Sequence, residues 1–143
     1  MKKAFWFDMD GTLADLYGVE NWEYKLRHND PSPYICARPL LSMTSLARLL
    51  HKVQRRGYKI GIISWTSRGG TEEYNEQVKQ AKLSWLAKHL KSVNFDYLDI
   101  VEYGTPKEDN RSGFLFDDDE RNRKQWGYDA LSEKGIIKKL KEI

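Results

Sequence analysis

The sequence lacks the residues that would cross-link the chain or place it in a membrane. Cys36 is the single cysteine, so no disulfide can form within the chain, and no cluster of cysteine and histidine suggests zinc. We expect Cys36 to be a buried structural thiol. No apolar stretch approaches the roughly 20 residues of a membrane span, and the Met-Lys-Lys start leads into a strand rather than a signal peptide. These absences predict a soluble, cytoplasmic protein without a membrane partner.

The sequence also has no tract rich in glycine, serine or proline, and its net charge is only +3. With 40% hydrophobic and 13% aromatic residues, the composition is that of a globular protein and excludes a disordered one. A chain of 143 residues can bury one sizeable core but not the cores of two ordinary domains. We therefore expect a single domain over residues 1–143. So small a charge does not by itself select a partner.

The most informative segment is residues 5–12, Phe-Trp-Phe-Asp-Met-Asp-Gly-Thr, in which an apolar run ends in two carboxylates. Gly11 allows a sharp turn, so Asp8 and Asp10 can face one point in space. Their mutual repulsion is relieved by a hard divalent cation, a shared proton or a basic partner, and Mg²⁺ suits oxygen-only ligands. The alternative is a strand end followed by an ordinary Asp-Gly turn.

Apolar periodicity predicts alternating strands and helices along the rest of the chain. We expect strands at residues 3–8, 58–64, 97–102 and 113–116, helices at 40–56, 71–91 and 132–142, and an irregular segment at 15–37. Gly57 is placed to end the first helix, and Thr71 to cap the second. This alternation predicts an α/β fold, with a doubly wound, mostly parallel sheet flanked by helices. Ligands bind at the carboxyl ends of such strands.

Several polar side chains fall at these strand ends or in the loops that leave them. Ser64 follows the second strand, with Thr66 and Ser67 as neighbouring hydroxyl candidates. Lys107 lies in the loop before the last strand and competes with Lys124 as the lysine of the site. The last strand breaks into three carboxylates, Asp117, Asp118 and Asp119, which an acidic surface turn would also explain.

The chain thus contains four motifs in order: the Asp-x-Asp-Gly-Thr segment, Ser64, Lys107 and the acidic triplet. In this order they resemble the motifs of the haloacid dehalogenase (HAD) superfamily of phosphotransferases, and the resemblance extends from Phe5 to about Asn122. The resemblance implies a HAD-like Rossmannoid fold and a phosphatase that hydrolyses a phosphate monoester. Asp8 would be the nucleophile that forms an aspartyl-phosphate. Asp10 would protonate the leaving oxygen and then activate water.

The resemblance also implies a Mg²⁺ cofactor and supporting residues. Asp8 and Asp117 would hold the metal with the Asp10 backbone carbonyl, and Asp118 would support it directly or through water. The ligand pair among Asp117, Asp118 and Asp119 stays open. The supporting residues would be Ser64 on a phosphoryl oxygen, Lys107 as the cation that steadies Asp8, and Asn122 beside the metal ligands.

The spacing of the motifs leaves little room for the cap domain that many HAD enzymes carry. About 50 residues separate Asp10 from Ser64, and part of them forms the 40–56 helix, so residues 15–37 suffice for a small flap or lid only. An open, capless site suits a nucleic-acid end, a phosphoprotein, or a small substrate enclosed by another subunit of a homo-oligomer. We expect residues 15–38 and the loop after Ser64 to set specificity.

The substrate class is indicated by one short string and by aromatic residues. Ser-x-Thr-x-Arg, ending at Arg68, resembles both polynucleotide 3'-phosphatases and small nucleotidases. Trp22 and Trp65, with Arg38, favour a nucleotide or nucleic-acid phosphate over a sugar phosphate, although partly buried packing is the better explanation of either tryptophan taken alone. Two other classes compete: a receiver-like signalling domain, which the motif order disfavours, and a non-catalytic HAD-like phosphate-binding or interaction module.

Overall fold

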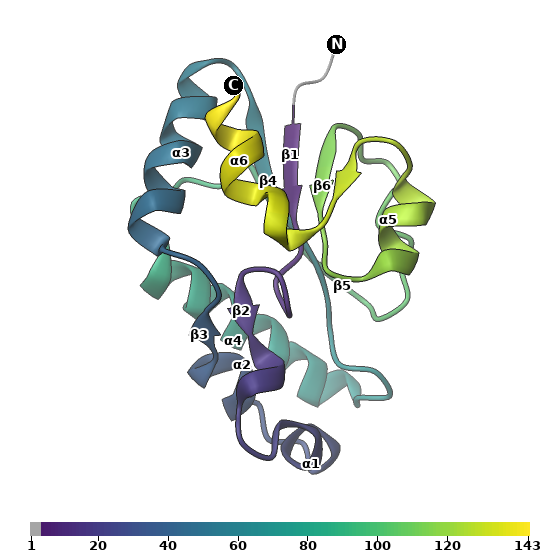
Figure 1. Ribbon diagram of the computed structural model, residues 1–143. Coiled ribbons are helices and arrows are strands. Elements are labelled where there is room, and N and C mark those ends of the chain that lie inside the picture. Colours follow the sequence, from purple (N-terminus) through teal and green to yellow (C-terminus); the bar gives the residue numbers. More distant parts are fainter. Residues whose placement is uncertain (1–3) are drawn as a thin grey trace.

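Residues 4–143 are described by a computed structural model, and within them a five-stranded sheet has the order β5-β4-β1-β6-β7 (Figure 1). Each pair of neighbouring strands is parallel. The strands are β1 (Ala4–Phe7), β4 (Lys59–Trp65), β5 (Tyr97–Val101), β6 (Phe114–Phe116) and β7 (Ala130–Leu131). Counted along the chain, this order is 3-2-1-4-5, in which the connections leave the central β1 in opposite directions. The doubly wound α/β fold is thereby confirmed.

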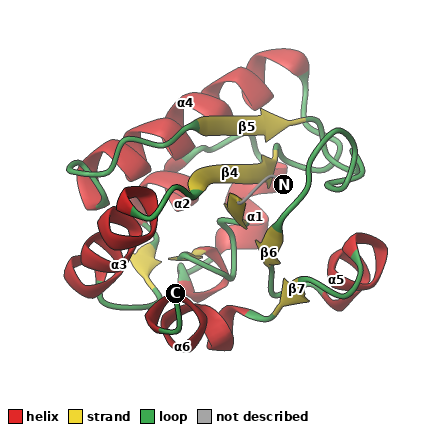
Figure 2. Ribbon diagram, turned by 90° about the horizontal axis from the view of Figure 1, so that it is seen from above, coloured by secondary structure: helices red, strands yellow, loops and turns green. Residues whose placement is uncertain are grey.

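Helices cover the two faces of this sheet unequally (Figure 2). In β1, Phe5 and Phe7 point to the face covered by α3 (Met43–Arg55), α4 (Glu72–His89) and α6 (Ile136–Lys141). Trp6 points to the other face, where Trp126 of α5 (Glu120–Trp126) packs. Because successive side chains of a strand alternate between faces, a continuous apolar run can supply both cores.

The two long helices are those that the sequence predicts, although α3 begins at Met43 rather than at residue 40 and α4 ends at His89 rather than at residue 91. The Ser42 side chain caps α3 by accepting from the Ser45 N–H, and Gly57, with φ of 91°, follows its end. Thr71 caps α4 by accepting from the Tyr74 N–H, as expected. Such caps satisfy backbone donors that a helix leaves without partners.

The prediction that residues 15–37 are irregular is wrong. This segment contains a 3₁₀ turn (Leu16–Gly18) and two short helices, α1 (Trp22–Arg27) and α2 (Ser32–Cys36), and is closed by β2 (Ala14–Asp15) pairing antiparallel with β3 (Arg38–Pro39). Helices of five or six residues are too short to show a periodic apolar pattern. Pro33 lies in the first turn of α2, where a missing N–H costs nothing. Tyr34 of α2 packs on Tyr74 and Val78 of α4.

Other differences from the prediction are small. Cys36 is exposed rather than buried, because α2 turns Tyr34 toward α4 and leaves its last residue at the surface. The sequence analysis missed α5, which is short and largely polar, and β7, which has two residues only. The last helix begins at Ile136, after a 3₁₀ turn, rather than at residue 132. Residue 3 of the first predicted strand lies outside the described residues. Within residues 4–143, no helix combines the length and apolarity needed to cross a bilayer.

Candidate active site

The candidate site lies where the carboxyl ends of β1 and β6 meet. Asp8 follows β1 and Asp117 follows β6, and the Asp8 N–H donates to the Phe116 carbonyl at 2.9 Å. This is the point where the chain connections leave the sheet in opposite directions, which leaves a crevice open to ligands. A cavity of about 480 Å³ opens there and is lined by both aspartates.

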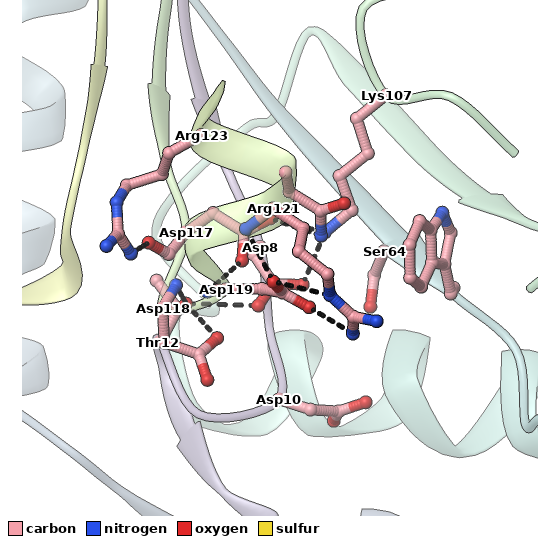
Figure 3. A network of polar contacts seen from close by, with 12 residues as sticks. Asp8, Asp10, Thr12, Ser64, Lys107, Asp117, Asp118, Asp119, Arg121 and Arg123 are labelled. Atoms are coloured by element: carbon pink, nitrogen blue, oxygen red, sulfur yellow. Dashed lines mark hydrogen bonds and ion pairs between the residues drawn. The ribbon is translucent and has the colours of Figure 1, made fainter. Parts of the chain in front are cut away.

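Three carboxylates converge at the base of this cavity (Figure 3). Oxygen atoms of Asp8, Asp117 and Asp118 all lie within 4.8 Å of one another. Asp119 faces elsewhere, since it caps α5 and forms a 3.0 Å ion pair with Arg121. Asp117 and Asp118 are therefore the members of the acidic triplet that converge with Asp8. Three clustered oxygen donors match the preference of Mg²⁺ for hard ligands.

Lys107 bridges two of these carboxylates from the loop between β5 and β6. Its ammonium lies 2.8 Å from Asp8 Oδ1 and 2.7 Å from Asp117 Oδ2, and the side chain is 3% exposed. The Trp65 indole N–H donates to the Thr105 carbonyl at 2.8 Å, which ties this loop to the end of β4. Lys124, its rival from the sequence, is exposed and pairs with Glu120.

The turn after β1 contributes a hydroxyl that the sequence analysis did not single out. Thr12 Oγ1 lies 3.0 Å from Asp8 Oδ2 and 3.1 Å from Asp118 Oδ1, and it accepts from the Asp118 N–H at 3.1 Å. A hydroxyl has one proton, so it can donate to only one of the two carboxylates at a time. Gly11 has φ of 81°, and a Cβ there would collide with the Asp118 carboxylate. Glycine thus brings the turn against the acidic cluster.

Opposing effects set the ionisation of Asp8. Burial alone would raise the pKa of Asp8, but the Lys107 ammonium and the hydrogen bonds from Asp118 and Lys107 outweigh it and lower the pKa. Burial likewise disfavours the Lys107 ammonium, yet Asp8 and Asp117 raise the pKa of Lys107 above its ordinary value. Asp8 is therefore held ionised beside a fixed cation.

The other two carboxylates of the cluster resist ionisation. Burial and the neighbouring Asp8 charge raise the pKa of Asp117 to about 6. Burial and a hydrogen bond with Asp8 raise the pKa of Asp118 to about 8. Without a cation, this cluster is thus an unfavourable site for three negative charges. A divalent cation would relieve that repulsion, so the residues fit Mg²⁺.

The Asp10 side chain is held apart from this cluster (Figure 3). Its Oδ2 accepts from the Lys82 ammonium at 2.8 Å. Burial raises the pKa of Asp10 above its ordinary value, although Lys82 opposes the rise. The expected metal contact of Asp10 was through its backbone carbonyl, and that contact stays a prediction.

Lys82, which the sequence analysis missed, is 1% exposed in the middle of α4. Its position was visible in the sequence, because Val78, Lys82 and Leu86 are four residues apart and share the buried face of the helix. A lysine on such a face is almost never fully buried unless it is paired.

Ser64 is a second partner of the Lys82 ammonium, in addition to Asp10. It is fully buried, its Oγ accepts from Lys82 at 2.7 Å, and it does not line the cavity. Thr66 and Ser67, its two rivals, do line it. Asn122 is buried beside the acidic cluster and donates to Asp117 Oδ2 at 3.1 Å.

Aromatic side chains form much of the cavity wall. Tyr17 and Trp22 meet edge to face with ring centroids 5.0 Å apart, and Trp65 and Tyr103 lie 4.8 Å apart. The arginines on the wall are Arg27, Arg68 and Arg121. Arg38, which the sequence suggested, is on β3 and does not line the cavity. Residues 16–34 and the loop after β4 thus both contribute to the wall.

The fold is similar to that of a known phosphatase over nearly the whole chain. The structure is similar to the crystal structure of D,D-heptose 1,7-bisphosphate phosphatase from Burkholderia thailandensis, with a TM-score of 0.59. The match covers 99% of this chain and 97% of that chain, at 11% sequence identity. No protein-family model and no curated protein matches the sequence. The similarity therefore concerns the arrangement of the whole chain in space.

Proposed function

We propose that this chain, which has the haloacid dehalogenase fold, is a Mg²⁺-dependent phosphatase that acts on phosphate monoesters through an aspartyl-phosphate. The observation that carries the proposal is the separation of two neighbouring carboxylates into different environments. Asp8 lies among the converging carboxylates beside Lys107, and its pKa is lowered; Asp10 lies against Lys82, and its pKa is raised. Paired groups whose pKa values are moved apart suit separate nucleophilic and acid–base roles.

In the first step, a carboxylate oxygen of Asp8 attacks the phosphorus atom and the ester P–O bond breaks. Asp10 gives its proton to the departing oxygen, so the leaving group departs as a neutral alcohol. In the second step, Asp10 takes a proton from water as the water oxygen attacks phosphorus. The bond between phosphorus and Asp8 breaks, and inorganic phosphate and free Asp8 are released.

Other residues would manage the charge of the phosphoryl group. The Lys107 ammonium is placed to offset negative charge as the phosphoryl oxygens approach Asp8. The hydroxyls of Thr66 and Ser67 line the cavity and are placed to donate to a phosphoryl oxygen, whereas the buried Ser64 hydroxyl accepts from Lys82 and would have to become accessible to play that part. Mg²⁺ held by Asp8, Asp117 and Asp118 would reduce the electrostatic repulsion between the anionic nucleophile and the phosphate.

The cavity supports a nucleotide or a nucleic-acid end as the substrate. Its aromatic wall offers ring faces on which a base can stack, and three arginines add positive charge to that wall. Residues 15–37 would act as a small flap in place of a cap domain. We place the reaction in the cytoplasm, where phosphorylated nucleotides are abundant.

A hydrolysis assay tests the activity. Purified protein should release p-nitrophenol from p-nitrophenyl phosphate with Mg²⁺ but not with EDTA. Asp8→Asn should abolish this activity, because an amide is not a nucleophile for phosphorus. Asp129→Asn, an exposed aspartate outside the cavity, should retain it. Activity that survives Asp8→Asn or chelation contradicts the mechanism, and inactivity on every ester favours a phosphate-binding module.

A substrate panel tests the finer proposal. It should compare mononucleotides, oligonucleotides with 3'- or 5'-phosphate, a phosphopeptide and a sugar phosphate at equal concentrations. Higher kcat/KM for the nucleotide or oligonucleotide esters supports the proposed class. Preference for the sugar phosphate, the class that the name of the structural neighbour suggests, contradicts it.

A further inference from the structure

Lys82 is a buried cation with every proton engaged. Its Nζ donates to Asp10 Oδ2 at 2.8 Å, to Ser64 Oγ at 2.7 Å and to the Trp65 carbonyl at 2.6 Å. An ammonium group has three protons and no acceptor, so these contacts use its full capacity. The Tyr34 ring, 5.1 Å from Nζ, packs beside it. Lys82 thereby fixes one oxygen of Asp10 relative to the end of β4.

Stability alone does not call for a lysine at this position. Removing an ammonium from water is costly, and replacing both partners of a buried ion pair by well-packed apolar side chains is often neutral or stabilising, whereas removing one partner alone is destabilising. The neighbours of Lys82 on the buried face of α4 are apolar: Val78, Ala81, Trp85 and Leu86. A methionine would complete this face but would replace one partner only, and it would leave the Asp10 carboxylate, the Ser64 hydroxyl and the Trp65 carbonyl without their shared donor. The lysine is therefore best explained by what it holds.

The contact with Lys82 makes the two oxygens of Asp10 unequal. Because Lys82 can only donate, the Oδ2 that it contacts must act as an acceptor. A proton carried by this carboxyl therefore resides on Oδ1. Asp10 lines the cavity and its side chain is 20% exposed, so the carboxyl is open to a ligand.

We propose that Lys82 is a positioning residue that holds Asp10 through Oδ2 and presents Oδ1 to the leaving oxygen of the substrate. The inference rests on the proposed phosphatase function. Lys82 acts through Asp10 and differs in this from Lys107, which contacts the nucleophile and Asp117. Without Lys82, the Asp10 carboxyl can rotate, and either oxygen can carry the proton. Proton delivery should then suffer more than phosphoryl transfer.

The test compares two esters that differ in how much they need a proton. p-Nitrophenolate departs readily without protonation, whereas the alkoxide of β-glycerophosphate must be protonated as it leaves. Values of kcat/KM cover the steps up to departure of the leaving group and exclude hydrolysis of the aspartyl-phosphate. We expect Lys82→Met to lower kcat/KM for β-glycerophosphate about tenfold or more beyond its effect on p-nitrophenyl phosphate. Lys88→Met, an exposed lysine of the same helix, should change neither value.

A double-mutant cycle tests whether Lys82 acts through Asp10. In an Asp10→Asn background, Lys82→Met should cause little further loss of kcat/KM on β-glycerophosphate. Equal losses on both esters, or full additivity with Asp10→Asn, overturn the proposal. If Lys82→Met does not fold, as judged by circular dichroism, Lys82→Gln replaces it, because the amide is polar but uncharged. A wild-type protein that hydrolyses neither these two esters nor any ester of the substrate panel overturns the proposed function and this inference together, whereas an active wild type with equal losses overturns the inference alone.

Discussion

The Lys107 ammonium lies 2.8 Å from Oδ1 of Asp8, so the proposed nucleophile is in contact with a buried cation. The contact joins the loop before β6 to the end of β1. It compensates a negative charge that would otherwise be buried against Asp117 and Asp118. The contact between Lys107 and Asp8 should therefore contribute both to the stability of the fold and to the rate of hydrolysis.

Replacing Lys107 should therefore lower both stability and activity. Lys107→Met leaves two buried carboxylates without their cation, which costs about 3 to 5 kcal/mol in the free energy of unfolding in EDTA. Saturating Mg²⁺ should recover part of this loss, because it neutralises the same charges. Hydrolysis should fall about 10²- to 10³-fold. Urea unfolding and steady-state kinetics measure the two effects, with the exposed Lys124→Met as control. Equal unfolding energies for Lys107→Met and Lys124→Met in EDTA would contradict the ion-pair argument.

The effect of Mg²⁺ on stability should increase with pH. The folded protein raises the pKa of Asp118 from 3.8 to about 8, so it retains a proton that the unfolded chain loses. In EDTA, the Asp118 contribution to stability is full below about pH 4 and is lost as the pH rises toward about 8. Mg²⁺ displaces this proton and removes the penalty. The thermal shift on adding Mg²⁺ should therefore be larger at pH 8 than at pH 5.

Asp118→Asn isolates this effect from the other titrating groups. In EDTA, the variant should gain stability relative to wild type as the pH rises, because its amide stays neutral. It should also show a smaller thermal shift with Mg²⁺. Parallel curves of melting temperature against pH for the two proteins would refute the assignment.

Gly11→Ala should impair metal binding in addition to stability. Gly11 has φ of 81°, and an alanine Cβ would push the Asp118 carboxylate out of place. Gly57→Ala is a matched control, since Gly57 has φ of 91° but no atom within 4 Å of the added Cβ. Both variants should lose about 1 to 2 kcal/mol through the left-handed backbone. Only Gly11→Ala should weaken Mg²⁺ binding in isothermal titration calorimetry. An unchanged affinity of Gly11→Ala for Mg²⁺ would show that the position of Asp118 does not matter for metal binding.

Trp22→Ala should raise KM for nucleotide substrates. Loss of a stacking partner costs about 1 to 3 kcal/mol, which corresponds to a rise of about 5- to 150-fold. KM for β-glycerophosphate, which has no ring, should change much less. Tyr128→Ala, an exposed aromatic outside the cavity, is the control. Equal changes in KM for both substrates would indicate that Trp22 only shapes the wall.

The sequence indicates most of the fold because its long elements carry strong local signals. Alternating apolar runs marked β1, β4, β5 and β6, and capping residues marked α3 and α4. The short helices α1, α2 and α5 have too few turns to produce a periodic pattern. Pro31 and Pro33 lie in the segment that was expected to be irregular, although proline also suits the first turn of a helix. The exposure of Cys36 depends on how α2 packs against α4, which local patterns do not encode.

The residues of the candidate site likewise fall into those that the sequence predicts and those that it does not. Asp8, Lys107 and Asp117 lie at the ends of apolar runs or just before one, so their convergence follows from a parallel sheet. Lys82 escaped notice because a lysine in a helix is usually exposed, and its partner Asp10 is 72 residues away. Thr12 was overlooked because its role depends on the fold of the turn that Gly11 permits. Long-range pairings of this kind are properties of the assembled sheet.

These pairings also have a kinetic consequence. Lys107 and Asp8 are 99 residues apart, and Thr12 and Asp118 are 106 apart, so the cluster can assemble only after β1 has paired with β6. Parallel pairings between distant segments form slowly, since the chain must close large loops first. A ligand of the completed cluster should therefore slow unfolding while leaving the refolding rate almost unchanged. Recovery of hydrolysis after dilution from denaturant would then report the last event in folding.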